Sequence, residues 1–399
     1  MATIAIFVDA EEGHVLSTFW LSRYLKARGH VVCYLSHADA DVERMIRNQG
    51  FEFTAISDNS TLTSIQHGKY LGPLVRGELL DSTIAKLRPD VALVLSEYCL
   101  AGLAIRYRYQ LPIIYFTPML RRYARIHEFE IVIRELLEVK SGVAEFLELL
   151  TKAGERFKSF RDVARLVLNI PEIILLPEAF DLPGRDKDPK SYYVGAGIDL
   201  MRSEELFPWD CIDSSRPLVY CARGSQLQID KEANRRLLQI SIDAAATRHE
   251  WQFIIAISKI FKAEDFFNIP PNAKLFNWAP QLEVLSRSNV MVNHGGFGTI
   301  KECVHMGAPM VVLPLKGRRD HSDCAQRVAY HGLGVQNDDP NISPGELILL
   351  IDQVLNDTSF RYRVDQMREM FKRQDRLELA AQVIENVIAG HTEIALHNT

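Results

Sequence analysis

The chain has 399 residues, of which 47% are hydrophobic and 24% charged, and its formal net charge is −5. This length exceeds what one hydrophobic core usually supports, so it predicts two domains, and the composition excludes a mainly disordered chain. The negative charge argues against nucleic acid as a partner, because phosphate contacts require an excess of Lys and Arg.

The six cysteines are scattered singly along the chain. This spacing suggests neither a zinc site nor a redox couple, and it indicates small buried residues in a reducing compartment. Residues 3–8 form an apolar run without the basic flank of a signal peptide, and no apolar run approaches the roughly 20 residues that span a bilayer. The sequence therefore predicts a cytoplasmic protein without a transmembrane segment.

The first half of the chain alternates between strand and helix patterns. Strands are expected at 4–8, 31–35, 91–95 and 113–116, and helices at 15–28 and 41–50. This alternation predicts an α/β domain with a parallel sheet. Residues 128–150 and 162–168 follow a helical period without a strand, which is typical of packing helices or of the wall of a ligand pocket.

A second α/β pattern follows a stretch that is rich in Pro and Gly between 177 and 217. Strands are expected at 218–221, 253–257 and 290–292, and helices at 237–246 and within 344–387. We therefore predict one domain over 1–200, a second over 215–375, and a C-terminal helix within 376–399 that crosses back to the first domain.

The most informative turn links the strand that ends at Asn293 to a helix that begins near Thr299. Gly295 and Gly296 let backbone N–H groups approach a ligand closely, and the helix N-terminus adds partial positive charge. This arrangement predicts a phosphate site. The helix end and His294 can stabilise a departing diphosphate in the way that a metal ion otherwise would.

The segment 277–328 reads Asn-Trp-Ala-Pro-Gln, then Asn-His-Gly-Gly-Phe-Gly-Thr-Ile-Lys-Glu, then Gly-Ala-Pro-Met-Val-Val-Leu-Pro. In spacing it resembles the donor signature of the UDP-glycosyltransferase superfamily, which includes bacterial antibiotic-type glycosyltransferases. The resemblance implies the GT-B fold, in which two Rossmann-like domains face each other across a cleft. It also implies sugar transfer from a UDP- or dTDP-sugar to a small natural-product-like acceptor, without a metal or another cofactor.

The resemblance assigns roles to residues of the second domain. Trp278 would stack on the pyrimidine, Gln281 would contact the base or ribose, and Glu302 would hold the ribose hydroxyls. The diphosphate would contact Gly224, Ser225, His294, Gly295, Gly296, Gly298 and Thr299, where Gly298 replaces an Asn of the family. Asp320 and His321 would bind the sugar, although the family has Gln in place of His321.

In the first domain, His14 follows Glu11, Glu12 and Gly13 at a strand-to-helix turn, and this turn resembles the one that carries the family's catalytic histidine. A neutral imidazole can remove the proton of an acceptor hydroxyl, which then attacks the sugar with inversion. In the family an Asp near the end of a later strand orients the histidine. Here Glu97 is the expected substitute, with Ser96 as the alternative.

Several charged residues keep two interpretations open. Arg223, in place of a usual aromatic residue, faces either the phosphate or a salt-bridge partner. Residues 39–41 spell the Asp-x-Asp of another glycosyltransferase fold, but at a helix start they indicate a cap. A third group can form a solvated ion-paired face or contact an anionic acceptor: Arg106, Arg108, Arg121, Arg122 and Arg125.

Other functions use the same features. A catalytically inactive homologue that binds nucleotide sugar and assists another transferase is one alternative, since Glu97 and His321 depart from the family pattern. A lipid-linked or cell-wall glycosyltransferase, or an epimerase of the same fold, is another, because a diphosphate site at a helix end can be reused.

Overall fold

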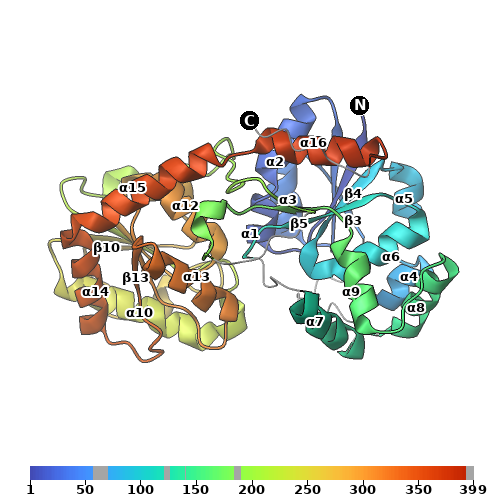
Figure 1. Ribbon diagram of the computed structural model, residues 1–399. Coiled ribbons are helices and arrows are strands. Elements are labelled where there is room, and N and C mark those ends of the chain that lie inside the picture. Colours follow the sequence, from blue (N-terminus) through green and yellow to red (C-terminus); the bar gives the residue numbers. More distant parts are fainter. Residues whose placement is uncertain (57–70, 121–125, 140, 184–189, 392–399) are drawn as a thin grey trace. The chain divides into compact units, whose positions relative to one another are not determined.

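The computed structural model describes residues 1–56, 71–120, 126–139, 141–183 and 190–391. The chain divides into two compact units (Figure 1): unit 1 comprises 1–176, 183–199 and 375–399, and unit 2 comprises 177–182 and 200–374. Each unit contains one parallel sheet with helices, so the predicted class of two α/β domains is confirmed.

The sheet of unit 1 has the strand order β3-β2-β1-β4-β5-β6-β7, with parallel neighbours throughout. Its strands are β1 (Thr3–Phe7), β2 (Val31–Ser36), β3 (Glu52–Ala55), β4 (Val91–Leu95), β5 (Ile113–Thr117), β6 (Glu172–Ile174) and β7 (Ser191–Tyr193). Strands β4 and β5 are buried at every residue, as is typical of central strands covered on both faces. The four strands expected in this half are present.

The helices of unit 1 are α1 (Glu12–Leu16), α2 (Phe19–Ala27), α3 (Ala40–Asn48), α4 (Leu71–Arg76), α5 (Asp81–Leu87), α6 (Cys99–Tyr109), α7 (Ile126–Val139), α8 (Val143–Lys152), α9 (Phe160–Leu168) and α16 (Leu377–Ile388). The buried residues of α16 belong to the hydrophobic core of this unit. The side chain of Asp39 accepts hydrogen bonds from the backbone N–H groups of Asp41 and Val42, which confirms the cap interpretation.

The prediction of one helix over 15–28 is wrong, because the chain forms two helices with a break at Ser17 and Thr18. The hydroxyl of Ser17 donates to the carbonyl of His14, and that of Thr18 donates to the carbonyl of Val15. Such local bonds compete with continued helical bonding. The break gives His14 a short helix of its own.

The sheet of unit 2 has the order β10-β9-β8-β11-β12-β13. Its strands are β8 (Leu218–Ala222), β9 (Gln252–Ala256), β10 (Ala273–Phe276), β11 (Val290–Asn293), β12 (Met310–Val312) and β13 (Gly334–Gln336). Its helices are α10 (Lys231–Thr247), α11 (Gln281–Arg287), α12 (Phe297–Met306), α13 (Arg319–Tyr330), α14 (Pro344–Asn356) and α15 (Thr358–Arg373).

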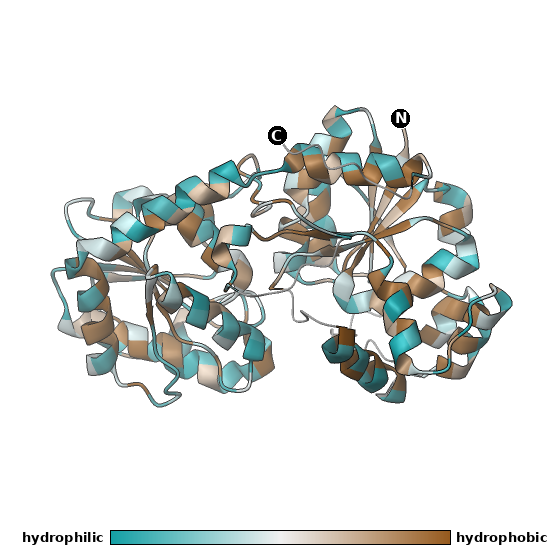
Figure 2. Ribbon diagram, in the orientation of Figure 1, coloured by the Kyte–Doolittle hydropathy of each residue, from teal (hydrophilic) through white to brown (hydrophobic). Residues whose placement is uncertain are grey.

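Apolar residues are concentrated in the strands of both sheets, while many helices carry hydrophilic residues on part of their surface (Figure 2). Within the described ranges, no helix is both long and apolar enough to cross a membrane. All six cysteines are free thiols; five of them are buried, whereas Cys211 is exposed and corrects the expectation that all six lie inside.

Each sheet contains one point at which the strand order reverses. In unit 1, β1 lies between β2 and β4, and in unit 2, β8 lies between β9 and β11. At such a point the connections leave the neighbouring strands toward opposite faces, which opens a crevice at the carboxyl ends of the strands. The chemistry of this chain is expected beside β1 and β4, and beside β8 and β11.

Candidate functional site

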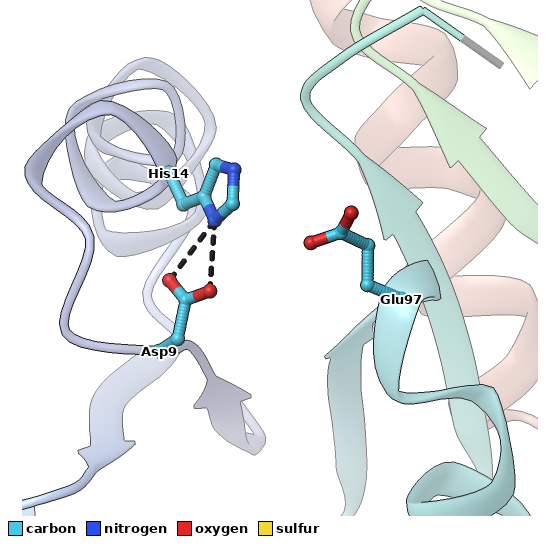
Figure 3. A group of neighbouring side chains, drawn as sticks. All are labelled: Asp9, His14 and Glu97. Carbon is cyan, nitrogen blue, oxygen red and sulfur yellow. Dashed lines mark hydrogen bonds and ion pairs between the residues drawn. The ribbon is translucent and has the colours of Figure 1, made fainter. Parts of the chain in front are cut away.

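The reversal point of unit 1 holds a histidine and two carboxylates. Asp9 follows β1, and His14 lies on α1. Glu97 and Tyr98 follow β4 in the short 3₁₀ helix Ser96–Tyr98. Figure 3 shows that Glu97 comes from the opposite side of the group and directs its carboxylate toward His14 and Asp9.

Asp9 is the residue that holds the imidazole of His14. Nδ1 of His14 lies 2.9 Å from Oδ1 and 3.0 Å from Oδ2 of Asp9, as the dashed lines in Figure 3 mark. Asp9 also accepts from the hydroxyl of Tyr98 at 3.1 Å and from the backbone N–H of Glu11 at 3.2 Å. Because Asp9 engages Nδ1, Nε2 of His14 remains on the other side of the ring, where it is able to exchange a proton.

This geometry corrects the expectation that Glu97 or Ser96 orients His14. The hydroxyl of Ser96 instead accepts a hydrogen bond from Thr117 at 2.7 Å. Glu97 acts on His14 through its charge. The sequence analysis assigned no role to Asp9. Its position just after β1, only five residues before His14, was a signal that could have identified it.

The surroundings of His14 favour its protonated form. Burial of the ring opposes the charge, but the negative charges of Asp9, Glu11 and Glu97 and the hydrogen bond to Asp9 outweigh it and raise the pKa of His14 to about 9. For Asp9, burial is likewise outweighed by His14 and by the hydrogen bonds, so the pKa of this carboxyl is lowered. The two residues form an ion pair at neutral pH, and His14 becomes a free base as the pH rises.

The same three side chains also have the composition of a small metal site. Asp9, His14 and Glu97 each offer one ligand atom, and these atoms lie within 4.8 Å of one another. Carboxylate oxygen and imidazole nitrogen suit several divalent ions. A binding experiment therefore has to include a chelator.

An apolar pocket adjoins this group. Its volume is about 80 Å³, and Val8, next to Asp9, and the ring of Tyr98 form part of its wall. The other lining residues include Leu71, Leu74, Leu79, Leu80, Ala101 and Ile105. A cavity of about 150 Å³ holds benzene, so this smaller one suits a branched alkyl group or the edge of a ring. Tyr98 links the pocket to Asp9 through its hydroxyl.

The reversal point of unit 2 holds the glycine-rich turn. Gly224 follows β8 and has a φ of +81°, and Gly295 follows β11 with a φ of +88°. A β-carbon on Gly224 would lie 2.6 Å from Cε1 of His294, and one on Gly296 would lie 2.4 Å from Nε2 of that ring. The absence of side chains at both positions thus allows the imidazole of His294 to fit between two backbone segments.

Three buried nitrogen-bearing side chains gather near this turn: Arg223, His294 and His321, of which His321 lies 3.7 Å from the carboxylate of Asp320. The rings of His294 and His321 meet edge to face with centroids 4.7 Å apart. Within the described part of the chain, Nδ1 of each ring and Nη2 of Arg223 have no hydrogen-bond partner. Arg223 donates to the carbonyl of Leu313 at 2.8 Å and to the amide oxygen of Asn234 at 3.4 Å. Among the described residues, neither of these partners is a carboxylate, so the salt-bridge interpretation of Arg223 has no support there.

The three groups differ in charge at neutral pH. Burial, followed by the charges of His321, Arg223 and Arg318, lowers the pKa of His294 far below its ordinary value. Burial is also the main cause that lowers the pKa of His321 to about 4. Burial lowers the pKa of Arg223 to about 9, so its guanidinium remains charged at neutral pH. The imidazoles are neutral, and Arg223 supplies the cationic group.

Residues expected to bind the nucleoside lie on α11, on α12 and just before α11. Trp278, between β10 and α11, is 38% exposed, which is high for an indole and leaves surface for a planar base. Nε2 of Gln281 donates to Oε2 of Glu302 at 2.7 Å and so joins the two helices. Glu302 is also bonded to Arg202, a residue that sequence reasoning did not single out.

The other residues that were expected to bind the diphosphate or the sugar also lie after strands of the sheet of unit 2. Ser225 is exposed after β8, while Gly298 and Thr299 lie in the first turn of α12, with Gly298 exposed and open space where its side chain would be. Asp320 lies on α13 after β12, where Arg318 donates to its carboxylate at 3.2 Å. All of these residues follow strands of one parallel sheet.

The arginine-rich stretch is only partly described. Arg108 donates to Asp81 through Nη2 at 2.7 Å, which fits the interpretation as an ion-paired face. Arg121, Arg122 and Arg125 lie outside the described residues.

Residues 242–386 match the family model described as erythromycin biosynthesis protein CIII-like, C-terminal domain. Over 423 residues, the chain is 25% identical to demethyllactenocin mycarosyltransferase of Streptomyces fradiae, covering 98% of this chain and 87% of that protein.

Two solved structures share the fold. The glycotransferase of kitacinnamycin superposes with a TM-score of 0.75 at 23% identity, covering 97% of this chain and 98% of that one. The spinosyn rhamnosyltransferase SpnG, complexed with thymidine diphosphate, gives a TM-score of 0.70 at 17% identity, covering 97% of this chain and 100% of that one.

The raised pKa of His14 can be measured in the free protein. In the wild type, the His14 resonance should titrate near pH 9 in NMR spectra. Asp9→Asn removes the main stabilising charge, while burial and the smaller effects of Glu11 and Glu97 remain, so the pKa should fall well below that of the wild type. Glu97→Gln removes a more remote charge and should lower the pKa by less. A His14 that still titrates near 9 in the Asp9→Asn protein would contradict this account.

Proposed function

Because the chain belongs to the UDP-glycosyltransferase superfamily of the GT-B fold, with antibiotic-type enzymes among its relatives, we propose that it transfers a sugar from a UDP- or dTDP-sugar to a hydroxyl of a small natural-product-like acceptor. His14 is the general base, and the configuration at the sugar is inverted. The reaction requires no metal ion.

The observation that carries this proposal is the buried group of Arg223, His294 and His321 in unit 2, in which Arg223 is the cation. A buried guanidinium without a carboxylate is costly, and a bound anion removes that cost. Arg223, His294 and His321 gather where two loops leave β8 and β11, beside the N-terminus of α12. A diphosphate satisfies this site, and its developing charge is stabilised there as the sugar bond breaks.

The nucleoside end of the donor is assigned from Trp278, Gln281 and Glu302. The exposed indole of Trp278 provides a stacking surface, and Glu302 provides an acceptor for a hydroxyl of the ribose. The thymidine diphosphate in the SpnG structure supports a pyrimidine nucleotide as donor. Asp320 and His321 are proposed to contact the transferred sugar.

The acceptor is proposed to bind in unit 1. Asp9 fixes His14 through Nδ1, so Nε2 is the atom that removes the proton from the acceptor hydroxyl. The adjoining apolar pocket receives a hydrocarbon part of the acceptor. The hydroxyl oxygen then attacks the anomeric carbon from the face opposite the diphosphate, which inverts the configuration.

The donor assignment is tested by thermal shift with UDP, dTDP, GDP and ADP, each with and without EDTA. A ligand that binds only the folded state raises the melting temperature, by an amount set by its concentration relative to Kd. UDP or dTDP should stabilise the protein, the purine nucleotides should not, and EDTA should make no difference. Stabilisation by purines alone, or none at all, would refute the donor assignment; a shift abolished by EDTA would refute metal independence.

The role of His14 is tested by His14→Ala, with the exposed His249→Ala as the matched control. Loss of a general base should lower kcat by about 10²- to 10⁴-fold while the thermal shift by nucleotide persists. In the wild type, log(kcat/KM) should rise with pH with unit slope and level off near pH 9, since only neutral His14 accepts a proton. Nucleotide binding without any transfer by the wild type would instead favour the inactive homologue.

The acceptor pocket is tested by Ala101→Trp, which fills the space lined by Leu74 and Ile105. A larger side chain should exclude the apolar part of the acceptor and raise the acceptor KM by about tenfold or more. The KM for the sugar donor and the thermal shift by nucleotide serve as internal controls and should not change. An unchanged acceptor KM in a folded variant would place the acceptor elsewhere.

A further inference from the structure

Arg202 is held between two carboxylates in unit 2. Its Nη1 and Nη2 donate to Oε1 and Oε2 of Glu302, the second at 3.3 Å, and its Nε donates to Oε1 of Glu204 at 2.7 Å. The three side chains are 6%, 10% and 13% exposed for Arg202, Glu302 and Glu204. Glu204 in turn accepts from the backbone N–H of Leu282 on α11. Both edges of the guanidinium are thus occupied, and its orientation is fixed.

The contacts of Arg202 limit what Glu302 can still accept. A carboxylate offers about four lone-pair positions, two on each oxygen. Oε2 of Glu302 accepts from Nη2 of Arg202 and from Nε2 of Gln281, and Oε1 accepts from Nη1 of Arg202. Counting the contacts made by the described residues, one position, on Oε1, remains for a ligand.

We propose that Arg202 is a positioning residue that restricts Glu302 to a single hydroxyl of the donor nucleoside, and thereby makes the site indifferent to the 2′-hydroxyl. This inference rests on the proposed function, which places the nucleoside beside Glu302. Ribose presents two adjacent hydroxyls, at C2′ and C3′, whereas 2′-deoxyribose presents only the one at C3′. Both positions of Oε2 are already occupied, so a second hydroxyl cannot donate to Glu302. On binding, that hydroxyl loses its hydrogen bond to water and gains none from Glu302 in return.

The contribution of the 2′-hydroxyl to binding is measured by comparing UDP with dUDP, because these two nucleotides share the base and the diphosphate and differ only in that hydroxyl. Isothermal titration of the wild type should give Kd values for the two that agree within about twofold. In Arg202→Met the two positions held by the guanidinium become available, so Glu302 can accept both hydroxyls. The preference for UDP over dUDP should then rise by about fivefold or more, the value of one hydrogen bond.

Arg248→Met is the matched control. Arg248 also lies between two carboxylates of unit 2: Nε donates to Glu250 at 2.6 Å, and both Nη atoms donate to Asp352. Loss of this arrangement should leave the ratio of Kd values unchanged. A general loss of stability in unit 2 weakens the binding of UDP and of dUDP by the same factor. The ratio of the two Kd values therefore separates a positioning role from an effect on folding.

Gln281→Leu provides a second variant in case Arg202→Met does not fold. It frees one position on Oε2 while Arg202 remains, and it should shift the ratio toward UDP as well. The role of Arg202 would be overturned if the wild type bound UDP at least fivefold more tightly than dUDP. It would also be overturned if Arg202→Met and Gln281→Leu changed both Kd values by the same factor. A folded wild type that binds neither nucleotide would instead refute the proposed function.

Discussion

The placement of one reversal in the strand order of each parallel sheet is the constraint on which the rest of this structure depends. Strands that neighbour a reversal send their connections to opposite faces, so their carboxyl ends are left accessible. Asp9 and Glu97 follow β1 and β4, and Gly224 and His294 follow β8 and β11. Both groups of candidate site residues therefore lie at the end of the sheet where a ligand can approach.

The two reversal points differ in how buried charge is balanced. In unit 1, His14 is paired with Asp9, so the imidazole can hold its proton in an ion pair and can also release it. In unit 2, Arg223 is buried against a carbonyl and an amide, and no carboxylate among the described residues binds it. The first arrangement suits proton transfer, and the second suits a ligand that brings its own negative charge.

The elements that sequence patterns predicted well are those whose burial is uniform. Strands such as 91–95 are apolar at every position and are flanked by turn residues, so local pattern and final environment agree. Short strands such as β6 and β13, with three residues each, carry too few side chains for a period to be recognised. The break between α1 and α2 escaped detection because it depends on where the hydroxyls of Ser17 and Thr18 form their bonds.

The sequence by itself determined the α/β class, the glycine-rich turn and its resemblance to nucleotide-sugar enzymes, and His14, because each of these depends on residues within one strand, turn and helix. Only the tertiary structure decided which carboxylate binds His14, since Asp9 and Glu97 reach it from two strands whose spacing is set by sheet pairing. It likewise brought Arg202 to Glu302 across 100 positions of sequence. Contacts of this kind depend on how distant segments pack, and no local period encodes them.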